Sequence, residues 1–455
     1  MTPSTRWLAV ASALALAGCE VRERMAWSPD GRTAALWSSG ELYLADPAGA
    51  LSGPFTNEVV QAAWAADGEA LIVVRQLAVT SWAEYAAVAP PNERRAVEGV
   101  APAVLPLLRG LRDAAGGDPQ RIAALVGERF GVRFDRGDLL APLALCVRDT
   151  RPDDWRELRT LLPESDLDTP ITATVWEVGA LRITAAETSS VRRLMTVSAS
   201  DVEVRPSPRR PWLAIRAGPR LSVWAVTGPT GTLEIAETVP GGFDWMGDGE
   251  RLACAVPVMP VWRDNAPNLA HLQVARIAVD GPEWRAVSTQ TLMAVVCPFR
   301  PLVRALGNDQ IVLPAAPSRF PHDAADAPPP PRLMVVRPAE AQGLRSEVRV
   351  LDVDGLPDDL RAIVPSPDGR HIAIVESGSD AVAVLDLDGQ SVRPISPRRG
   401  RSSLTLPAWR NAEELYFPAT GGTPDRFEWF LWRGGAVQPW STGWPEAAQP
   451  PSPPK

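Results

Sequence analysis

The pentapeptide Ser-Pro-Asp-Gly-Arg occurs twice in this chain, at residues 28–32 and at residues 366–370. Proline presets the backbone for a turn, aspartate accepts hydrogen bonds from nearby N–H groups, and glycine takes the left-handed conformation that closes the turn. Each copy lies between two short apolar runs, which is the pattern of a β-hairpin. A chain that repeats one hairpin near both of its ends is expected to be a repeat protein.

Weaker copies of this hairpin lie between the two clear ones, with Asp67-Gly68 and Asp248-Gly249 in their turns. Asp30 and Asp67 are 37 residues apart, close to the ~40–45 residues of a four-stranded propeller blade. The spacing predicts an all-β fold, a β-propeller of seven four-stranded blades. Six blades is the alternative if the third or fifth copy is only a long loop.

The repeated positions contain the most conspicuous candidate site residues. We interpret the Asp-Gly pairs as turn-forming rather than catalytic, because capping a turn is the usual role of aspartate before glycine. They are Asp30, Gly31, Asp67, Gly68, Asp248, Gly249, Asp368 and Gly369. Four tryptophans occupy equivalent places where a strand meets its turn, and we expect them to pack between blades. The alternative is that they form a ring of aromatic side chains on which a ligand stacks. They are Trp27, Trp64, Trp245 and Trp409.

Residues 80–165 interrupt the repeat. Apolar residues recur there at helical spacing, and helix-start signals stand at Asp118-Pro119 and Pro152. The pattern predicts a mostly helical insertion in blade two, which strands at 172–177 and 181–184 would complete. An insertion of this length on one loop is the best functional candidate, since long loops on a complete fold commonly carry function.

The N-terminus has the pattern of a bacterial export signal. Arg6 precedes an apolar run from Trp7 to Leu16, which is too short to span a bilayer as a mature helix. The following Leu16-Ala17-Gly18-Cys19 resembles the lipobox of bacterial lipoproteins, whose cysteine becomes the lipidated first residue. This resemblance implies acyl chains on Cys19, and Glu20 favours the outer membrane by the enterobacterial sorting rule.

The expected organisation follows from these patterns. It comprises a signal peptide (1–18), the first part of the propeller (19–79), the helical insertion (80–165), the remainder of the propeller (166–444) and a disordered Pro-rich tail (445–455). The two complete Ser-Pro-Asp-Gly-Arg turns resemble the WD40-like repeat of the TolB family of bacterial periplasmic propellers. That resemblance implies a propeller and does not carry over the partners of TolB.

Composition and motifs narrow the chemistry. A net charge of −8 argues against a nucleic-acid partner. His271, His322 and His371 are scattered, without a second ligand at metal-binding spacing, and no cofactor motif occurs, so neither a metal nor a cofactor is expected. With Cys19 lipidated, three cysteines are left, of which Cys254 and Cys297 lie in successive expected blades and a disulfide between them is left open.

We therefore expect a lipid-anchored β-propeller of the cell envelope, facing the periplasm, that acts as a binding or scaffold module for a protein or an envelope polymer. One alternative is a lactonase- or lyase-like enzyme with acids converging in the central channel. Another is a ligand-sensing propeller closed by the helical insertion. Convergence of carboxylates or histidines on one point would favour the enzyme, and an exposed apolar patch on the insertion would favour the binding module.

Overall fold

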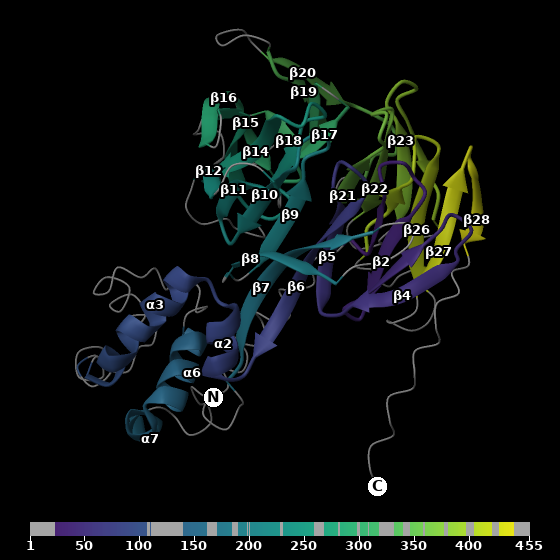
Figure 1. Cartoon of the computed structure of the whole chain (residues 1–455). Helices are drawn as coiled ribbons and strands as arrows, with labels where there is room; N and C mark the ends of the chain where they lie inside the picture. Colours follow the sequence, from purple (N-terminus) through teal and green to yellow (C-terminus); the bar gives the residue numbers. More distant parts are fainter. Residues whose placement is uncertain are drawn as a thin grey trace, which may run out of the picture.

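The computed structural model shows seven antiparallel blades of four strands that follow one another along the chain (Figure 1). The structure describes residues 23–440 except 107–109, 111–139, 162–170, 184–189, 198, 200, 228–230, 259–267, 281–282, 298–300, 308, 318–331, 340–345, 358–359, 377–380, 397–404 and 421–426. The prediction of seven blades is confirmed, and the alternative of six is wrong.

Each blade uses four consecutive strands. The first three blades are β1 (Met25–Trp27), β2 (Ala34–Ser38), β3 (Glu41–Ala45) and β4 (Leu51–Thr56); β5 (Val59–Trp64), β6 (Ala70–Val79), β7 (Ala173–Arg182) and β8 (Arg192–Val197); and β9 (Val202–Pro206), β10 (Trp212–Ala217), β11 (Arg220–Ala225) and β12 (Thr232–Glu237). The fourth and fifth are β13 (Phe243–Trp245), β14 (Arg251–Pro257), β15 (Asn268–Asp280) and β16 (Glu283–Cys297); and β17 (Arg304–Leu306), β18 (Gln310–Pro317), β19 (Arg332–Arg337) and β20 (Glu347–Leu351). The last two are β21 (Leu360–Pro365), β22 (His371–Glu376), β23 (Val382–Asp386) and β24 (Ser391–Pro394); and β25 (Ala408–Trp409), β26 (Glu414–Thr420), β27 (Phe427–Arg433) and β28 (Ala436–Trp440).

The first strands of the blades form the inner ring. Each contacts the first strand of the next blade, from β1 through β5, β9, β13, β17 and β21 to β25, and β25 contacts β1. A short ladder between β16 and β18 additionally joins the fourth and fifth blades. The ring is closed without a shared strand, because the first and last blades each use one contiguous segment of the chain.

Aromatic side chains fill the seam between the first and last blades. The ring centroid of Trp27 lies 4.8 Å from that of Tyr416 and 6.2 Å from that of Trp440. Nε of Arg410 donates to the carbonyl of Gly31 at 2.7 Å, and its guanidinium lies over the ring of Trp27. Buried aromatic area and this hydrogen bond therefore hold together a joint that has no strand pairing.

The alternation of strand direction gives the propeller two distinct faces. Four of the seven first strands end in an Asp-Gly turn, and we call the side on which the first strands end the turn face. The first strands begin on the opposite side, where the connection between β6 and β7 also lies. We call this second side the insertion face.

The insertion between β6 and β7 is helical where the structure describes it. It contains α2 (Trp82–Val88), α3 (Pro91–Val100), the 3₁₀ helix η1 (Ala101–Ala103), α6 (Leu140–Thr150) and α7 (Pro152–Leu161). The expected start of a helix at Pro152 matches α7, whereas Asp118-Pro119 lies outside the described residues. No helix in the described ranges is long and apolar enough to cross a membrane.

Blade two differs from the sequence expectation in its last two strands. The segments 172–177 and 181–184 were expected as separate strands, but β7 runs unbroken past Gly179 to Arg182, and β8 supplies the fourth strand. A Cβ on Gly179 would lie 2.4 Å from Cγ1 of Val191. Glycine is therefore required at this position for close packing within the sheet and does not mark a turn.

Candidate functional site

A network of charged side chains lies on and beside the innermost strands of the propeller, on the insertion face. Its members come from the segment before β1 and from the third, fourth and fifth blades, and they lie at or near the starts of these blades except Arg216, which is near the end of β10. They are Glu23, Asp201, Glu203, Arg205, Arg216, Asp244 and Arg304. We call this set the channel network.

Glu203 is the acceptor at the centre of the channel network. Nη2 of Arg205 donates to its Oε1 at 2.9 Å, the backbone N–H of Gly241 donates to its Oε2 at 2.8 Å, and Nε of Arg216 lies 3.5 Å from Oε2. Burial alone would raise the pKa of Glu203, but the nearby guanidinium groups outweigh it and lower that pKa to about 2. Glu203 is therefore ionised throughout the physiological pH range.

Arg205 connects Glu203 to two further carboxylates. Its guanidinium lies 3.9 Å from Asp244 and 4.0 Å from Glu23. Burial works against its charge, yet the surrounding carboxylates raise the pKa of Arg205. Through this one side chain the segment before β1 is tied to the third and fourth blades.

The pKa of Arg304 is shifted in the opposite direction to that of Arg205. Burial and the neighbouring charge of Arg205 lower its pKa. Its Nη1 donates to the carbonyls of Val303 at 2.8 Å and of Gly241 at 3.2 Å. These bonds attach the fifth blade to the connection before the fourth.

The geometry of the channel network indicates that these residues hold neighbouring blades together rather than act as acids or bases in catalysis. Carboxylates do converge, as the enzyme alternative requires, but they converge on Arg205: Glu203 accepts a hydrogen bond from it, and Asp244 lies 3.9 Å from it and accepts from the backbone N–H of Ala305. A general acid needs a proton near neutral pH, and a pKa of about 2 for Glu203 removes that capacity. Among the described residues no group of His, Cys, Asp and Glu is arranged to hold a metal ion.

The four predicted Asp-Gly turns all lie on the turn face with one shared geometry. Gly31, Gly68, Gly249 and Gly369 have φ angles of 67°, 69°, 72° and 71°. In each turn the aspartate accepts a hydrogen bond from the backbone N–H two residues later, at 2.9–3.1 Å. In the two Ser-Pro-Asp-Gly turns the serine hydroxyl also donates to the aspartate at 2.6 Å.

These bonds change the acidity of the turn carboxylates. The pKa of Asp30 is lowered, chiefly by the hydroxyl of Ser28. Burial is the largest single influence on the pKa of Asp248 and of Asp368 and would raise both values, but the hydrogen bonds and nearby positive charges together outweigh it and lower the pKa of each. The turn aspartates are thus occupied by their own backbone and neighbouring side chains.

The predicted tryptophans lie between blades, where the first strand ends. Three of them donate an indole N–H to the first strand of the preceding blade: Trp64 to Ala26 at 2.9 Å, Trp245 to Arg205 at 2.9 Å and Trp409 to Val364 at 2.8 Å. Trp27 occupies the equivalent place at the closing seam, but its buried indole N–H has no hydrogen-bond partner among the described residues.

The remaining candidate residues are dispersed. His271 is on β15, and His371 on β22 stacks on Trp409 with the ring centroids 6.1 Å apart. Cys19 and His322 lie outside the described residues.

The expectation that Cys254 and Cys297 lie in successive blades is wrong, because they are on β14 and β16 of the fourth blade. Both are free thiols in this structure, and burial raises the pKa of each to about 12. They form part of the core.

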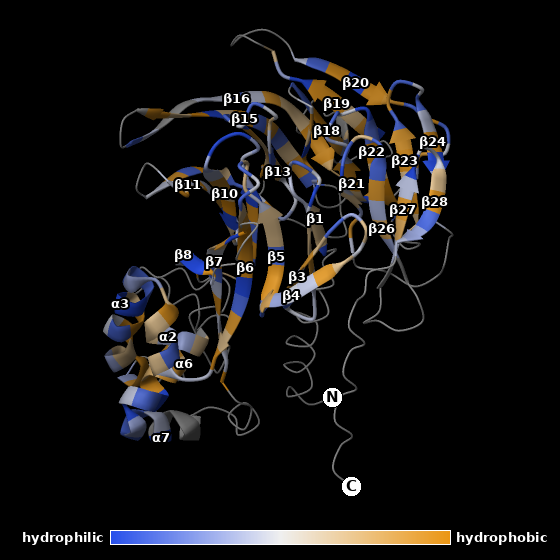
Figure 2. Ribbon diagram, turned by 45° about the vertical axis from the view of Figure 1, so that its right-hand side comes forward, coloured by the Kyte–Doolittle hydropathy of each residue, from blue (hydrophilic) through white to orange (hydrophobic). Residues whose placement is uncertain are grey.

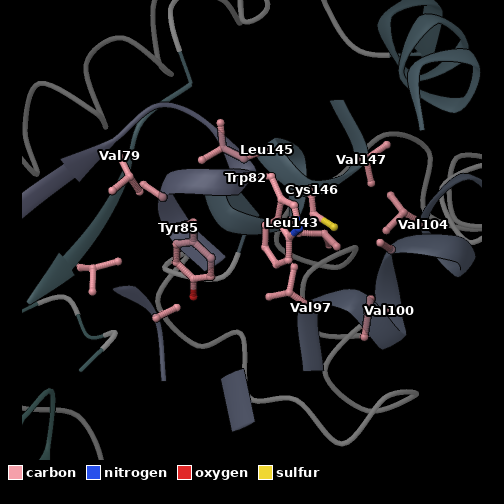
Figure 3. Close-up of a cluster of buried hydrophobic side chains, with 14 of the residues drawn as sticks. Val79, Trp82, Tyr85, Val97, Val100, Val104, Leu143, Leu145, Cys146 and Val147 are labelled. Carbon is pink, nitrogen blue, oxygen red and sulfur yellow. The ribbon is translucent and has the colours of Figure 1, made fainter. Parts of the chain in front are cut away.

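The helical insertion is a second candidate site. A core of its own fills the space between its helices, with Tyr85 and Leu145 wholly buried (Figure 3). Val79, Ala173 and Val175 of the supporting strands extend this core. The insertion is therefore packed onto the ends of β6 and β7.

Hydrogen bonds fix the orientation of the insertion. Ser81 and Glu84 form a capping box at the start of α2. Asp149 of α6 accepts from the backbone N–H of Trp82 at 2.7 Å, and Arg148 donates to the carbonyl of Thr80 at 2.6 Å. The large hydrophobic side chains exposed in the described structure belong to the propeller, so the exposed apolar patch that would favour a binding module is not seen on the described part of the insertion.

Sequence reasoning missed the channel network. Glu203 and Arg205 alternate with apolar residues on β9, and Asp244 occupies the middle of β13. Charged residues at alternate positions of a strand indicate side chains that lie on one side of it, and on an innermost strand that side faces the neighbouring blade. This signal was present, but it needed the identity of the innermost strands to be interpreted.

Comparison with known proteins assigns neither a family nor a function to this chain. No protein-family model and no curated protein sequence matches this chain. Among solved structures, the Cps50 (Swd1) β-propeller domain of Myceliophteria thermophila matches with 8% identity over 87% of this chain and 93% of that one, at a TM-score of 0.43. A chain of the mitotic checkpoint complex matches with 11% identity over 91% and 87%, at 0.40. A putative TolB of Agrobacterium tumefaciens matches with 13% identity over 55% of this chain and 84% of that one, at 0.36. The β-propeller assignment itself rests on the strand order of the seven blades.

Proposed function

We propose that this protein is a lipid-anchored β-propeller of the cell envelope that binds a protein partner through its helical insertion. In this proposal acyl chains on Cys19 attach it to the outer membrane, with the propeller in the periplasm. The propeller serves as a rigid scaffold for the insertion.

The observation that supports this proposal most is the construction of the insertion. Residues Leu77–Val79 of β6 pair with Ala173–Val175 of β7 past the end of the neighbouring β5 ladder, so two strands form a stalk. The helices lie at the end of this stalk, outside the ring of blades in both views (Figures 1 and 2). A unit with its own core, held away from a complete propeller, presents a defined surface to a partner.

The channel supports this interpretation over the two alternatives. Its converging carboxylates are committed to Arg205, as described above, which disfavours the lactonase- or lyase-like enzyme. The position of the helices outside the ring disfavours a lid over the channel.

Site-specific photocrosslinking in the native envelope tests the proposal. A photoreactive amino acid replaces Asp153 on α7, whose side chain is 89% exposed, and in a matched control it replaces Arg32 on the turn face, which is 85% exposed. We expect a discrete protein adduct from position 153 and none from position 32. Equal adducts from both positions, or an adduct with glycan instead of protein, would contradict the proposal.

The lipid anchor has its own test. Replacement of Cys19 by serine removes the thiol that would carry the lipid, so Cys19→Ser should move the protein from the membrane fraction to the soluble fraction. Unchanged fractionation would refute the lipoprotein part of the proposal and leave the photocrosslinking result intact.

A further inference from the structure

We infer that the insertion face is the side of the propeller turned toward the lipid bilayer, so that the helical insertion lies against the phospholipid head groups. This inference rests on the proposed lipidation of Cys19 and deepens it, because it assigns an orientation and a contact surface to the anchored protein.

The first argument is the place where the chain enters the propeller. The backbone N–H of Trp37, near the end of β2 on the insertion face, donates to the carbonyl of Arg24 at 3.1 Å. Glu23 lies 4.0 Å from Arg205 in the channel network on the same face. The chain is therefore held at the insertion face from Glu23 onward.

The second argument is the length of the tether. Glu23 is four positions after Cys19 in the sequence. A fully extended chain spans at most ~3.3–3.6 Å per residue, so Cys19 lies within about 14 Å of Glu23 whatever path the chain takes. A lipid on Cys19 therefore holds this face, and no other, close to the bilayer surface.

The third argument is the reach of the insertion. The stalk residues Leu77–Val79 extend about 10 Å beyond the blade at ~3.3 Å per residue. A helix with its side chains adds about 10 Å more. The total of about 20 Å exceeds the tether, so a propeller anchored at Cys19 brings its insertion into the head-group layer.

The charges on the insertion indicate what keeps it there. Arg156 and Asp153 form an exposed pair at 3.3 Å, and Arg94 pairs with Glu98 at 4.0 Å. Such balanced pairs give little attraction to an anionic surface, which requires clustered basic residues. For the described helices the tether, rather than the affinity of these exposed pairs for lipid, therefore sets the contact, and a protein partner of the insertion is one exposed at the membrane surface.

Energy transfer to labelled lipid tests the orientation. Full-length lipidated protein is reconstituted into phosphatidylethanolamine–phosphatidylglycerol vesicles that contain a head-group-labelled acceptor lipid. Donor dyes are attached to the single-site variants Asp153→Cys on the insertion and Arg32→Cys on the turn face. The native thiols of Cys146, Cys254 and Cys297 are buried and do not compete for the label.

We expect several-fold stronger transfer from position 153 than from position 32. Insertion of twenty Gly/Ser residues between Glu20 and Val21 should reduce the transfer from position 153, because a flexible linker of that length reaches ~25 Å. Equal transfer from both positions, a stronger signal from position 32, or insensitivity to the longer tether would overturn the orientation.

The same vesicles separate this inference from the proposal on which it rests. Protein carrying Cys19→Ser should give no transfer from either position. If it binds the vesicles as well as the parent, lipidation is refuted. If only the parent binds but both labels respond equally, lipidation stands and the orientation is refuted.

Discussion

Replacement of Glu203 by glutamine should remove the contribution that Glu203 makes to the pH dependence of the free energy of unfolding at acidic pH. The folded pKa of Glu203 is about 2, against an ordinary value of 4.5. With 1.36 kcal/mol for each pH unit between the two values, the ionised carboxylate contributes about 3 kcal/mol to the free energy of unfolding. Glu203 is 15% exposed, so solvent screens this contribution only in part.

The sign of the effect follows from the direction of the shift. Because folding lowers the pKa, the contribution of Glu203 is fully present above about pH 4.5 and disappears as the pH falls toward about 2. Glu203→Gln removes the charge at every pH. The variant should therefore be less stable than the parent by about 3 kcal/mol at pH 7 and equal to it near pH 2.

Urea unfolding followed by tryptophan fluorescence between pH 7 and pH 2 measures this difference. Glu69→Gln is the matched control, since Glu69 pairs with Arg182 at 3.4 Å on the surface, where both side chains are more than 60% exposed. Exposed pairs of this kind contribute ~0–1 kcal/mol. A Glu203→Gln deficit that stays constant with pH, or one no larger than that of the control, would refute the argument for the channel network.

Three further predictions concern packing and the insertion. Trp409→Phe should lower the free energy of unfolding by ~1 kcal/mol more than Trp27→Phe in urea titrations, because only Trp409 loses an inter-blade hydrogen bond; equal losses would contradict this. The thiols of Cys254 and Cys297 should react with a disulfide reagent at pH 8 only after unfolding, since both are buried; rapid reaction of the native protein would contradict their place in the core. Replacement of residues 81–171 by a short Gly/Ser linker should leave a propeller that unfolds cooperatively in calorimetry, because the helices form a core of their own; a molten product would show that the blades depend on the insertion.

The sequence predicted the blades because the decisive interactions are local. The turns at Asp30 and Asp368 are determined by residues within five positions of each other, so their copies could be recognised along the chain. The helix that begins at Pro152 was predicted for the same reason. The break expected between the segments 172–177 and 181–184 was wrong because the role of Gly179 depends on Val191, which lies just before β8 and packs against it.

The channel network could not be predicted in the same way because the contacts that join its blades are long-range. Glu203 and Arg304 are about 100 residues apart in the sequence, and their charges interact only when the third, fourth and fifth blades are packed together. The attachment of α6 to the start of α2 through Asp149 likewise joins distant segments. Local patterns identify the repeated unit, whereas the interactions that join blades depend on the ring as a whole.

The central claim is that a lipid-anchored propeller binds a protein partner through its insertion, and photocrosslinking in the native envelope tests it most directly. The photoreactive residue at position 153 is compared with that at position 32, each with and without Cys19→Ser. The account predicts a discrete protein adduct from position 153 that weakens when the anchor is lost, and none from position 32. An adduct from position 32 alone, or no protein adduct from position 153 in the anchored protein, would contradict it.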